Sequence, residues 1–236
     1  MNPTPEDKPT FARAGLLLGV RRTLPLAVSA TAFAAVFGVL ARQSGLTLVE
    51  AAMMSGLVFA GAAQFIALQL WISPLPIFTI IFTTLIVNLR HVLMGAALRP
   101  WLSKLPASKV YGSIFFMTDE TWALSIKEYR EGERDAAFIL GSGLTLFTGW
   151  VGGTVAGTVA GSALRQEDLV RWGLDFMFAA VFTALLAGMW RGKSDLLPWG
   201  VAALVAVVAK WWLPGTWYIL AGGIAGSVVG ALRDAG

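Results

Sequence analysis

Long apolar runs recur along the whole sequence, and this recurrence limits what the chain can fold into. A helix needs about 20 apolar residues to cross the hydrocarbon of a bilayer. The candidate segments are 23–41, 51–72, 76–98, 110–126, 136–163, 169–190, 196–213 and 216–232. We therefore predict an all-α, polytopic helical membrane protein with about seven to eight transmembrane helices.

The composition also favours a membrane protein. Only 14% of the residues are charged and 56% are hydrophobic, whereas about a quarter of the residues in a soluble domain are charged. The chain has no cysteine, which excludes disulfides and thiolate metal sites. Its net charge of +4 comes from cations in loops and at segment ends, where they orient a membrane protein, so nucleic-acid binding is not expected.

We expect a polar N-terminal segment, residues 1–22, followed by a single transmembrane domain, residues 23–232. The stretch RRTLPLAVSATAFA imitates a signal peptide, but the apolar run continues beyond it, so we interpret it as the first transmembrane helix. With the N-terminus inside and eight crossings, ten Lys and Arg residues lie inside and seven outside. The loop RPWLSKLPASK then lies on the outer side, against the positive-inside rule. Either one segment does not cross, or the rule is only loosely obeyed.

Two features bear on how the segments are arranged. Two adjacent carboxylates interrupt segment 110–126, so this segment either crosses the membrane or is a re-entrant piece. The stretch VFAGAAQFIALQLW (58–71) is similar to MFAAVFTALLAGMW (177–190). Unless this short match is chance, it indicates two related halves, an arrangement common in secondary transporters.

Glycines recur every four residues in two of the segments, and each row lies on one face of a helix. The rows are Gly149, Gly153, Gly157 and Gly161 in the fifth segment, and Gly222, Gly226 and Gly230 in the eighth. A glycine costs about 1 kcal/mol in a helix relative to alanine, so a row of glycines needs a packing reason. In a bilayer that reason is the close approach of another helix, within the chain or from a partner subunit.

Polar residues inside apolar segments are the candidate functional residues, because a charge at the bilayer centre costs about 2.5–3.5 kcal/mol. The stretch NLRHVLM holds the only histidine of the chain, and Thr84, Asn88, His91 and Gly95 share one helix face. His91 could exchange protons at physiological pH, and Arg90 could hold a substrate carboxylate. The alternative is that Arg90 reaches the membrane surface while His91 bonds a backbone carbonyl.

The stretch TDET, residues 118–121, is a second candidate. One of the carboxylates of Asp119 and Glu120 could pair with Arg90, and the other could bind a proton, a cation or a substrate ammonium. The alternative is structural, because Thr118 followed by acidic residues also fits a helix N-cap.

Two further places complete the set of candidates. Gly61 and Gln64 lie in GAAQF, a stretch that can bend or break and expose backbone groups to a ligand, or that simply packs around one buried amide. Asp175 opens segment 169–190, where it could couple transport to protons or pair with Arg171 one turn earlier. The substrate-binding candidates are Gln64, Gly61, Asn88, Arg90 and Asp119, and the proton-coupling candidates are His91, Glu120 and Asp175.

Four stretches taken in order, MSGLVFAGAAQFIALQLW, NLRHVLMGAALRPWL, TDETWAL and LDFMFAAVFTALLAGMW, resemble the AzlC family, the large subunit of bacterial branched-chain amino-acid exporters. The resemblance covers residues 15–232. It implies export of leucine, isoleucine and valine, and in some members methionine. It also implies a separate small membrane partner of the AzlD type and a location in the bacterial inner membrane.

The residues by themselves predict a multi-span carrier, and we expect its coupling to be to protons. The sequence has no G-x-x-x-x-G-K-[ST] motif, so the chain is not expected to hydrolyse ATP. One histidine, no cysteine, no G-x-S-x-G and no H-E-x-x-H argue against an enzyme, and no cofactor or metal is expected. A carrier for another small zwitterion and a passive small-solute channel are the alternatives, and saturable countertransport separates a carrier from a channel.

Overall fold

The computed structural model describes residues 9–164, 192–213 and 217–234, together with the single residues 180, 183, 187 and 190. Every element named within these residues is a helix, which confirms the all-α class. In chain order the elements are α1 (Arg13–Gln43), α2 (Leu48–Leu57), α3 (Gly61–Gln69), α4 (Ile77–Asn88), α5 (Arg90–Ala97), α6 (Arg99–Leu102), α7 (Ala107–Phe115), α8 (Asp119–Arg130), α9 (Ala137–Ala163), the 3-10 turn η3 (Lys193–Asp195), α12 (Leu196–Trp212) and α13 (Trp217–Asp234).

Four helical stretches among the described residues are long and apolar enough to cross a membrane. They are Arg13–Gln43, Ile77–Ala97, Ala137–Ala163 and Lys193–Trp212. The described part of the chain thus contains fewer crossing helices than the seven to eight that the apolar runs indicate. Segment 169–190, with Asp175 and the second half of the possible internal repeat, lies almost wholly outside the described residues.

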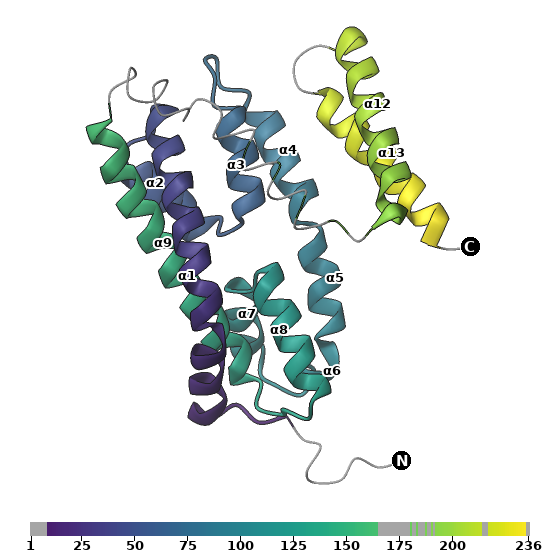
Figure 1. Ribbon diagram of the computed structural model, residues 1–236. Helices are drawn as coiled ribbons and strands as arrows, with labels where there is room; N and C mark the ends of the chain where they lie inside the picture. Colours follow the sequence, from purple (N-terminus) through teal and green to yellow (C-terminus); the bar gives the residue numbers. More distant parts are fainter. Residues whose placement is uncertain are drawn as a thin grey trace.

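Helices α1 and α9 run side by side in the same direction and pack against each other over most of their length (Figure 1). The glycine row of α9 makes this contact, as the sequence predicted. A Cβ added at Gly157 would lie 2.0 Å from the carbonyl oxygen of Ala35, and one at Gly153 would lie 2.4 Å from that of Thr31. The two backbones therefore touch, and only glycine leaves room for this approach.

The start of this helix pair explains why α1 begins ten residues before the expected first crossing. The carboxylate of Asp135 accepts hydrogen bonds from the amides of Ala12 and Gly15, each at 2.9 Å, and from the amide of Ala137 at 3.1 Å. One side chain thus satisfies orphan amides at the beginnings of both α1 and α9, and its negative charge suits both positive helix ends. Residues 13–22, expected to belong to a polar segment, are helical because this anchor extends α1 along α9.

Segment 51–72 does not form one continuous crossing helix, because the helix breaks just before GAAQF, the stretch at which the sequence allowed a bend or break. Helix α2 starts beside the end of α1, where the amide of Leu46 bonds the carbonyl of Ala41, and runs inward until Phe59 meets Phe147. The chain then turns, and α3 runs back until Phe65 packs on Phe37, near the end of α1 (Figure 1). The two half-helices form a re-entrant hairpin, made possible by the small residues around the break.

Segment 110–126 is also re-entrant, which was one of its two predicted arrangements. Helix α7 rises from the opposite end of the molecule, where Lys109 lies over the ring of Phe11, to Phe116, which also packs against Phe147. Helix α8 then runs back toward the end from which α7 started, where Tyr129 packs on Trp101 of α6 (Figure 1). The hairpins α2–α3 and α7–α8 therefore enter from opposite ends, and their tips meet halfway along α9.

Helices α4 and α5 continue each other across the molecule with one break at Leu89. The hairpin of α12 and α13, predicted from the short LPG connection, is also present. Its glycine face packs as expected, because a Cβ at Gly222 would lie 2.6 Å from the carbonyl oxygen of Ala202.

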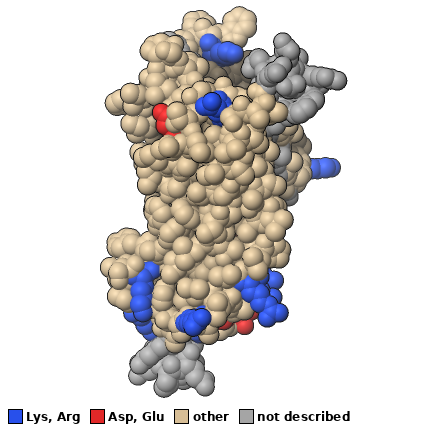
Figure 2. Space-filling view, turned by 90° about the vertical axis from the view of Figure 1, so that its left-hand side faces the viewer, with Lys and Arg blue, Asp and Glu red and all other residues tan. Residues whose placement is uncertain are grey.

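The re-entrant hairpins explain why the count of Lys and Arg with eight crossings gave only a weak difference between the two sides. On the face drawn in Figure 2, charged residues gather toward the two ends of the molecule and a band without Lys, Arg, Asp or Glu lies between them. Within residues 9–164, one end holds Arg13, Arg21, Arg22, Arg99, Lys104, Lys109, Lys127, Arg130 and Arg134, whereas the other holds Arg42. The loop RPWLSKLPASK thus lies on the same side as the N-terminal end of α1. By the positive-inside rule we expect this side to face the cytoplasm, and we call it the cytoplasmic end.

Replacement of Gly157 by alanine tests the contact between α1 and α9. The added methyl group would overlap the Ala35 carbonyl, and overpacking of this kind costs about 1–3 kcal/mol. We expect purified Gly157→Ala to unfold at a lower Tm, as measured by tryptophan fluorescence during heating. Gly152→Ala, on the same helix with nothing within 4 Å of the added Cβ, is the matched control and should unfold at the same temperature as the unmodified protein or slightly higher, because alanine favours the helix. Equal Tm values for the two variants would contradict the packing.

Single cysteines test the hairpin topology, because the natural chain has none. Ser103→Cys and Glu131→Cys flank α7–α8, and Gln43→Cys and Ser73→Cys flank α2–α3 at exposed positions. We expect the first pair to react with a membrane-impermeant thiol reagent only from the cytoplasmic side, and the second pair only from the outside. If the members of either pair react from opposite sides, the segment between them crosses the membrane and is not a hairpin.

Candidate functional site

The tips of the two hairpins meet around one aromatic side chain of α9. The ring of Phe147 lies 5.0 Å from that of Phe59 at the α2–α3 tip and 5.0 Å from that of Phe116 at the α7–α8 tip, both edge to face. Because edge-to-face rings at this separation attract each other, the contact holds both tips against α9. Broken helices at mid-depth are where transporters bind their substrates, so we take this junction as the candidate site.

The α2–α3 tip has two properties of a binding site. Phe59 has a φ of 42°, a left-handed conformation that a bulky side chain rarely adopts and that is often found at functional sites. Helix α3 begins at Gly61 with Ala60 as its N-cap, which provides no capping side chain. The first amides of α3 therefore present a positive helix end near the middle of the membrane, where it can attract an anion.

The α7–α8 tip carries the opposite charge and is paired with Arg90. A salt bridge joins the guanidinium of Arg90, at the start of α5, to the carboxylate of Asp119, at the start of α8. This pairing confirms one of the predicted alternatives for the two residues. Their side chains remain 36% and 46% exposed, so the pair can be reached by a small polar molecule.

Thr118 caps α8, which confirms the structural alternative for TDET as well. Its hydroxyl accepts a hydrogen bond from the amide of Thr121, and the hydroxyl of Thr121 accepts one from the amide of Thr118. The cap and the salt bridge are compatible, because the cap fixes the first turn of α8 and so fixes the direction in which Asp119 points. Glu120 is exposed on the same turn.

His91 and Asn88 lie next to this ion pair, on either side of the break between α4 and α5. A ring nitrogen of His91 lies 3.2 Å from the backbone oxygen of Asn88, the local contact expected in the structural alternative. The side-chain oxygen of Asn88 and Nε of Arg90 are buried, and neither has a hydrogen-bond partner among the described residues. The structure therefore brings Asn88, Arg90, His91, Asp119 and Glu120 into one polar cluster, whereas Asp175 lies outside the described residues.

Gln64 faces a different direction and is fully buried. Its amide nitrogen donates to the hydroxyl of Ser55 at 3.0 Å, and its oxygen accepts from the indole of Trp150 at 3.0 Å. Ser55 in turn bonds Thr154 of α9 at 2.7 Å. The network fastens both halves of the α2–α3 hairpin to α9, which is the packing alternative for this residue. Gly61 belongs to the same contact, because an added Cβ would lie 2.8 Å from the Trp150 ring.

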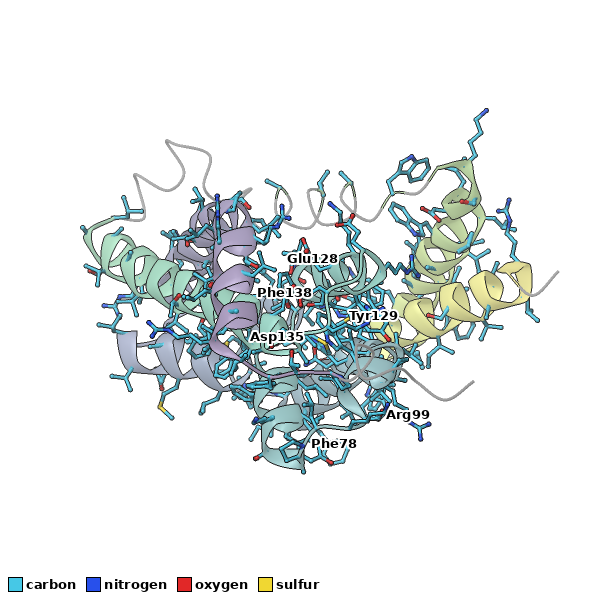
Figure 3. All side chains as sticks on the ribbon, turned by 90° about the horizontal axis from the view of Figure 1, so that it is seen from below. Phe78, Arg99, Glu128, Tyr129, Asp135 and Phe138 are labelled. Carbon is cyan, nitrogen blue, oxygen red and sulfur yellow. The ribbon has the colours of Figure 1, made fainter. Side chains whose placement is uncertain are left out.

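Several residues that build the site did not stand out in the sequence. Phe147 and Trp150 look like ordinary apolar residues of a glycine-rich segment. Nothing in their spacing shows that Phe147 contacts both hairpin tips or that Trp150 holds the α2–α3 hairpin. Glu128, whose carboxylate lies 3.3 Å from Arg22, sits with Asp135 in the interior of the cytoplasmic end (Figure 3). Its spacing of seven from Thr121 places both on one face of α8, the only sequence signal that could have indicated its burial.

These features define a polytopic helical membrane protein with discontinuous helices and an ion pair at its centre. A family model described as AzlC protein matches residues 25–164. The chain belongs to the AzlC family, in agreement with the resemblance of its motifs.

Relatives extend over most of the chain. An uncharacterized membrane protein of Archaeoglobus fulgidus is 36% identical over 79% of this chain and 80% of its own length. Inner membrane protein YgaZ of Escherichia coli is 30% identical over 82% of this chain and 80% of its own. The branched-chain amino acid transport protein AzlC of Bacillus subtilis is 25% identical over 71% of this chain and 65% of its own. No solved structure matches.

Replacement of Gln64 by leucine separates the two interpretations of this residue. Removal of the amide leaves the Trp150 indole and the Ser55 hydroxyl with fewer partners in a buried place, which costs about 1–3 kcal/mol. We therefore expect a clear fall in Tm for Gln64→Leu. Gln69→Leu, at an exposed position of the same helix, is the control and should change stability by less than about 0.5 kcal/mol. Unchanged stability with lost transport in Gln64→Leu would instead support direct contact with substrate.

Proposed function

We propose that this chain is the large subunit of a secondary transporter that exports branched-chain amino acids across a bacterial inner membrane. Its substrates are leucine, isoleucine, valine and, by the family resemblance, methionine. The observation that carries the proposal is the meeting of two opposed hairpin tips at Phe147, next to the Arg90–Asp119 ion pair. The similarity to the branched-chain amino acid transport protein AzlC of Bacillus subtilis supports this substrate class.

The charges at the junction suit a zwitterion. An amino acid carries a carboxylate and an ammonium close together, so its site needs a cationic and an anionic group at matching separation. Arg90 and the uncapped start of α3 can receive the carboxylate. Asp119 can receive the ammonium. In the substrate-free protein Arg90 and Asp119 neutralise each other, which lowers the cost of holding two charges inside the membrane. A bound zwitterion would replace this pairing. Its carboxylate would bind Arg90 in place of Asp119, and its ammonium would bind Asp119 in place of Arg90.

The surroundings of the ion pair suit an apolar side chain. Phe59, Phe116 and Phe147 form an aromatic cluster at the junction, and rings of this size offer a large apolar contact area. Branched aliphatic side chains gain free energy by contact with such a surface. A polar amino acid would gain less, because its side chain would lose hydrogen bonds to water.

Proton coupling belongs to the same proposal. His91 and Glu120 lie beside Asp119 and are the proton-exchanging candidates within the described residues; Asp175 keeps this role as a prediction. Histidine is suited to it because its ordinary pKa lies close to physiological pH. The chain acts as a carrier and not as an enzyme in this proposal, with no cofactor, and a small membrane subunit of the AzlD type is its partner.

Efflux of labelled leucine from preloaded vesicles tests the transport function. The chain is assayed alone and with the small partner, with and without an imposed proton gradient. Charge-assisted hydrogen bonds contribute about 1.5–3 kcal/mol, so Asp119→Asn and Arg90→Gln should each lower efflux about tenfold or more. Lys127→Gln removes a charge from an exposed pair of the same helix α8, 3.9 Å from Glu131, and should transport normally.

Three outcomes would change the proposal. Unlabelled leucine on the opposite side should accelerate efflux in a carrier, and no acceleration would indicate a passive channel. Absence of leucine efflux with both subunits inserted would point to another small zwitterion, to be identified by competition. Normal efflux in the Asp119→Asn and Arg90→Gln variants would show that the ion pair is not part of the substrate site.

A further inference from the structure

A groove of about 460 Å³ opens on the surface between the end of α5 and the start of α7. It lies apart from the hairpin junction, at the cytoplasmic end of the molecule. Its walls are mostly apolar and include Ala96, Leu102, Leu105, Val110 and Ile114. Gly95 leaves one wall open, because nothing lies within 4 Å of the position that a Cβ would take. The groove therefore has the width for a flexible apolar chain.

The rim of this groove is polar and basic. Arg99, Ser103 and Tyr111 line it, and Lys104 lies next to Ser103 in the chain. The sequence contains no Asp or Glu between residues 91 and 118. Among the described residues neither Arg99 nor Lys104 forms an ion pair, and Figure 3 shows Arg99 at the periphery, away from Glu128 and Asp135. The positive charge of the rim is thus available to an anion.

The groove lies at the depth where hydrocarbon meets lipid headgroups. One turn before Gly95 on α5, Val92 and Leu93 are 67% and 74% exposed, so this surface faces the lipid chains. Tyr111 is 73% exposed, in the position of an aromatic residue at the membrane interface. Apolar walls thus continue from the hydrocarbon to a basic rim at the headgroup level.

We propose that this groove binds an anionic phospholipid of the inner leaflet. Its acyl chain lies along the apolar walls, and Arg99 and Lys104 hold its phosphate, as basic pockets between helices on the cytoplasmic side do. A free phosphate ion would use the rim and leave the apolar walls without a partner. A zwitterionic lipid would fill the walls but would bring an ammonium group to a rim that is already positive. The proposal does not depend on the transported substrate.

Thermal unfolding of the purified full chain in detergent tests the site. Phosphatidylglycerol should raise Tm in a saturable manner, whereas phosphatidylethanolamine and inorganic phosphate should have little effect. Each basic residue near a lipid surface contributes enough attraction that Arg99→Gln should weaken phosphatidylglycerol binding about fivefold. Gly95→Phe fills the groove without a change of charge and should remove most of the shift.

Arg130→Gln is the matched control, since it removes one exposed positive charge from the same end of the protein, outside the groove. It should keep the full response to phosphatidylglycerol. An equal response to phosphatidylethanolamine, or equal losses in Arg99→Gln and Arg130→Gln, would overturn the proposal in favour of unspecific attraction. A full response in Gly95→Phe would overturn the groove as the place of binding, and a response to inorganic phosphate alone would indicate an anion site without a lipid. Ala96→Leu narrows the same wall and replaces Gly95→Phe if that variant does not fold.

Discussion

The backbone contact between α1 and α9 is the constraint on which the rest of the structure depends. A membrane offers little hydrophobic gain for helix association, so close packing and polar anchors must supply it. Here the glycines of α9 let the carbonyls of α1 approach to a distance that any side chain would prevent, and Asp135 fixes the starting level of both helices. The register so defined places Phe147 and Trp150 at the depth where the hairpins turn.

The polar centre is possible because of this scaffold. Non-helical backbone within a bilayer must be covered by protein, and the two tips are covered by each other and by α9. Gln64, Ser55 and Thr154 fasten one hairpin from within, whereas the other is joined to α5 by the Arg90–Asp119 pair and by the Trp122 indole, which donates to the Met94 carbonyl at 3.1 Å. One tip is therefore held by buried neutral groups and the other by a half-exposed charge pair. Of the two, the charge pair is the one that a zwitterion can enter.

Hairpins in place of crossings also decide the orientation of the chain. A re-entrant hairpin begins and ends on the same side of the membrane. The chain therefore stays on one side across α2–α3 and again across α7–α8, where a crossing helix would take it to the other side. The cations of residues 99–109 then join those of α1 and α8 at one end, and the same end carries the basic rim of the α5–α7 groove. The distribution of charge and the hairpin topology therefore support each other.

The sequence alone determined the features that depend on local composition and period. Apolar length predicted the helical membrane class, four-residue glycine spacing predicted the packing faces of α9 and α13, and NLRH and TDET indicated the residues of the ion pair. The sequence allowed a break at GAAQF and a re-entrant segment 110–126, but tertiary structure decided that both segments turn back, because α2 and α3 are as apolar as crossing helices. It also decided that Gln64 lies within a packing network with Trp150, and that Phe147 supports both tips. The spacing of apolar residues along the chain cannot reveal such contacts, because they join residues that are far apart in the sequence and meet only when the helices pack.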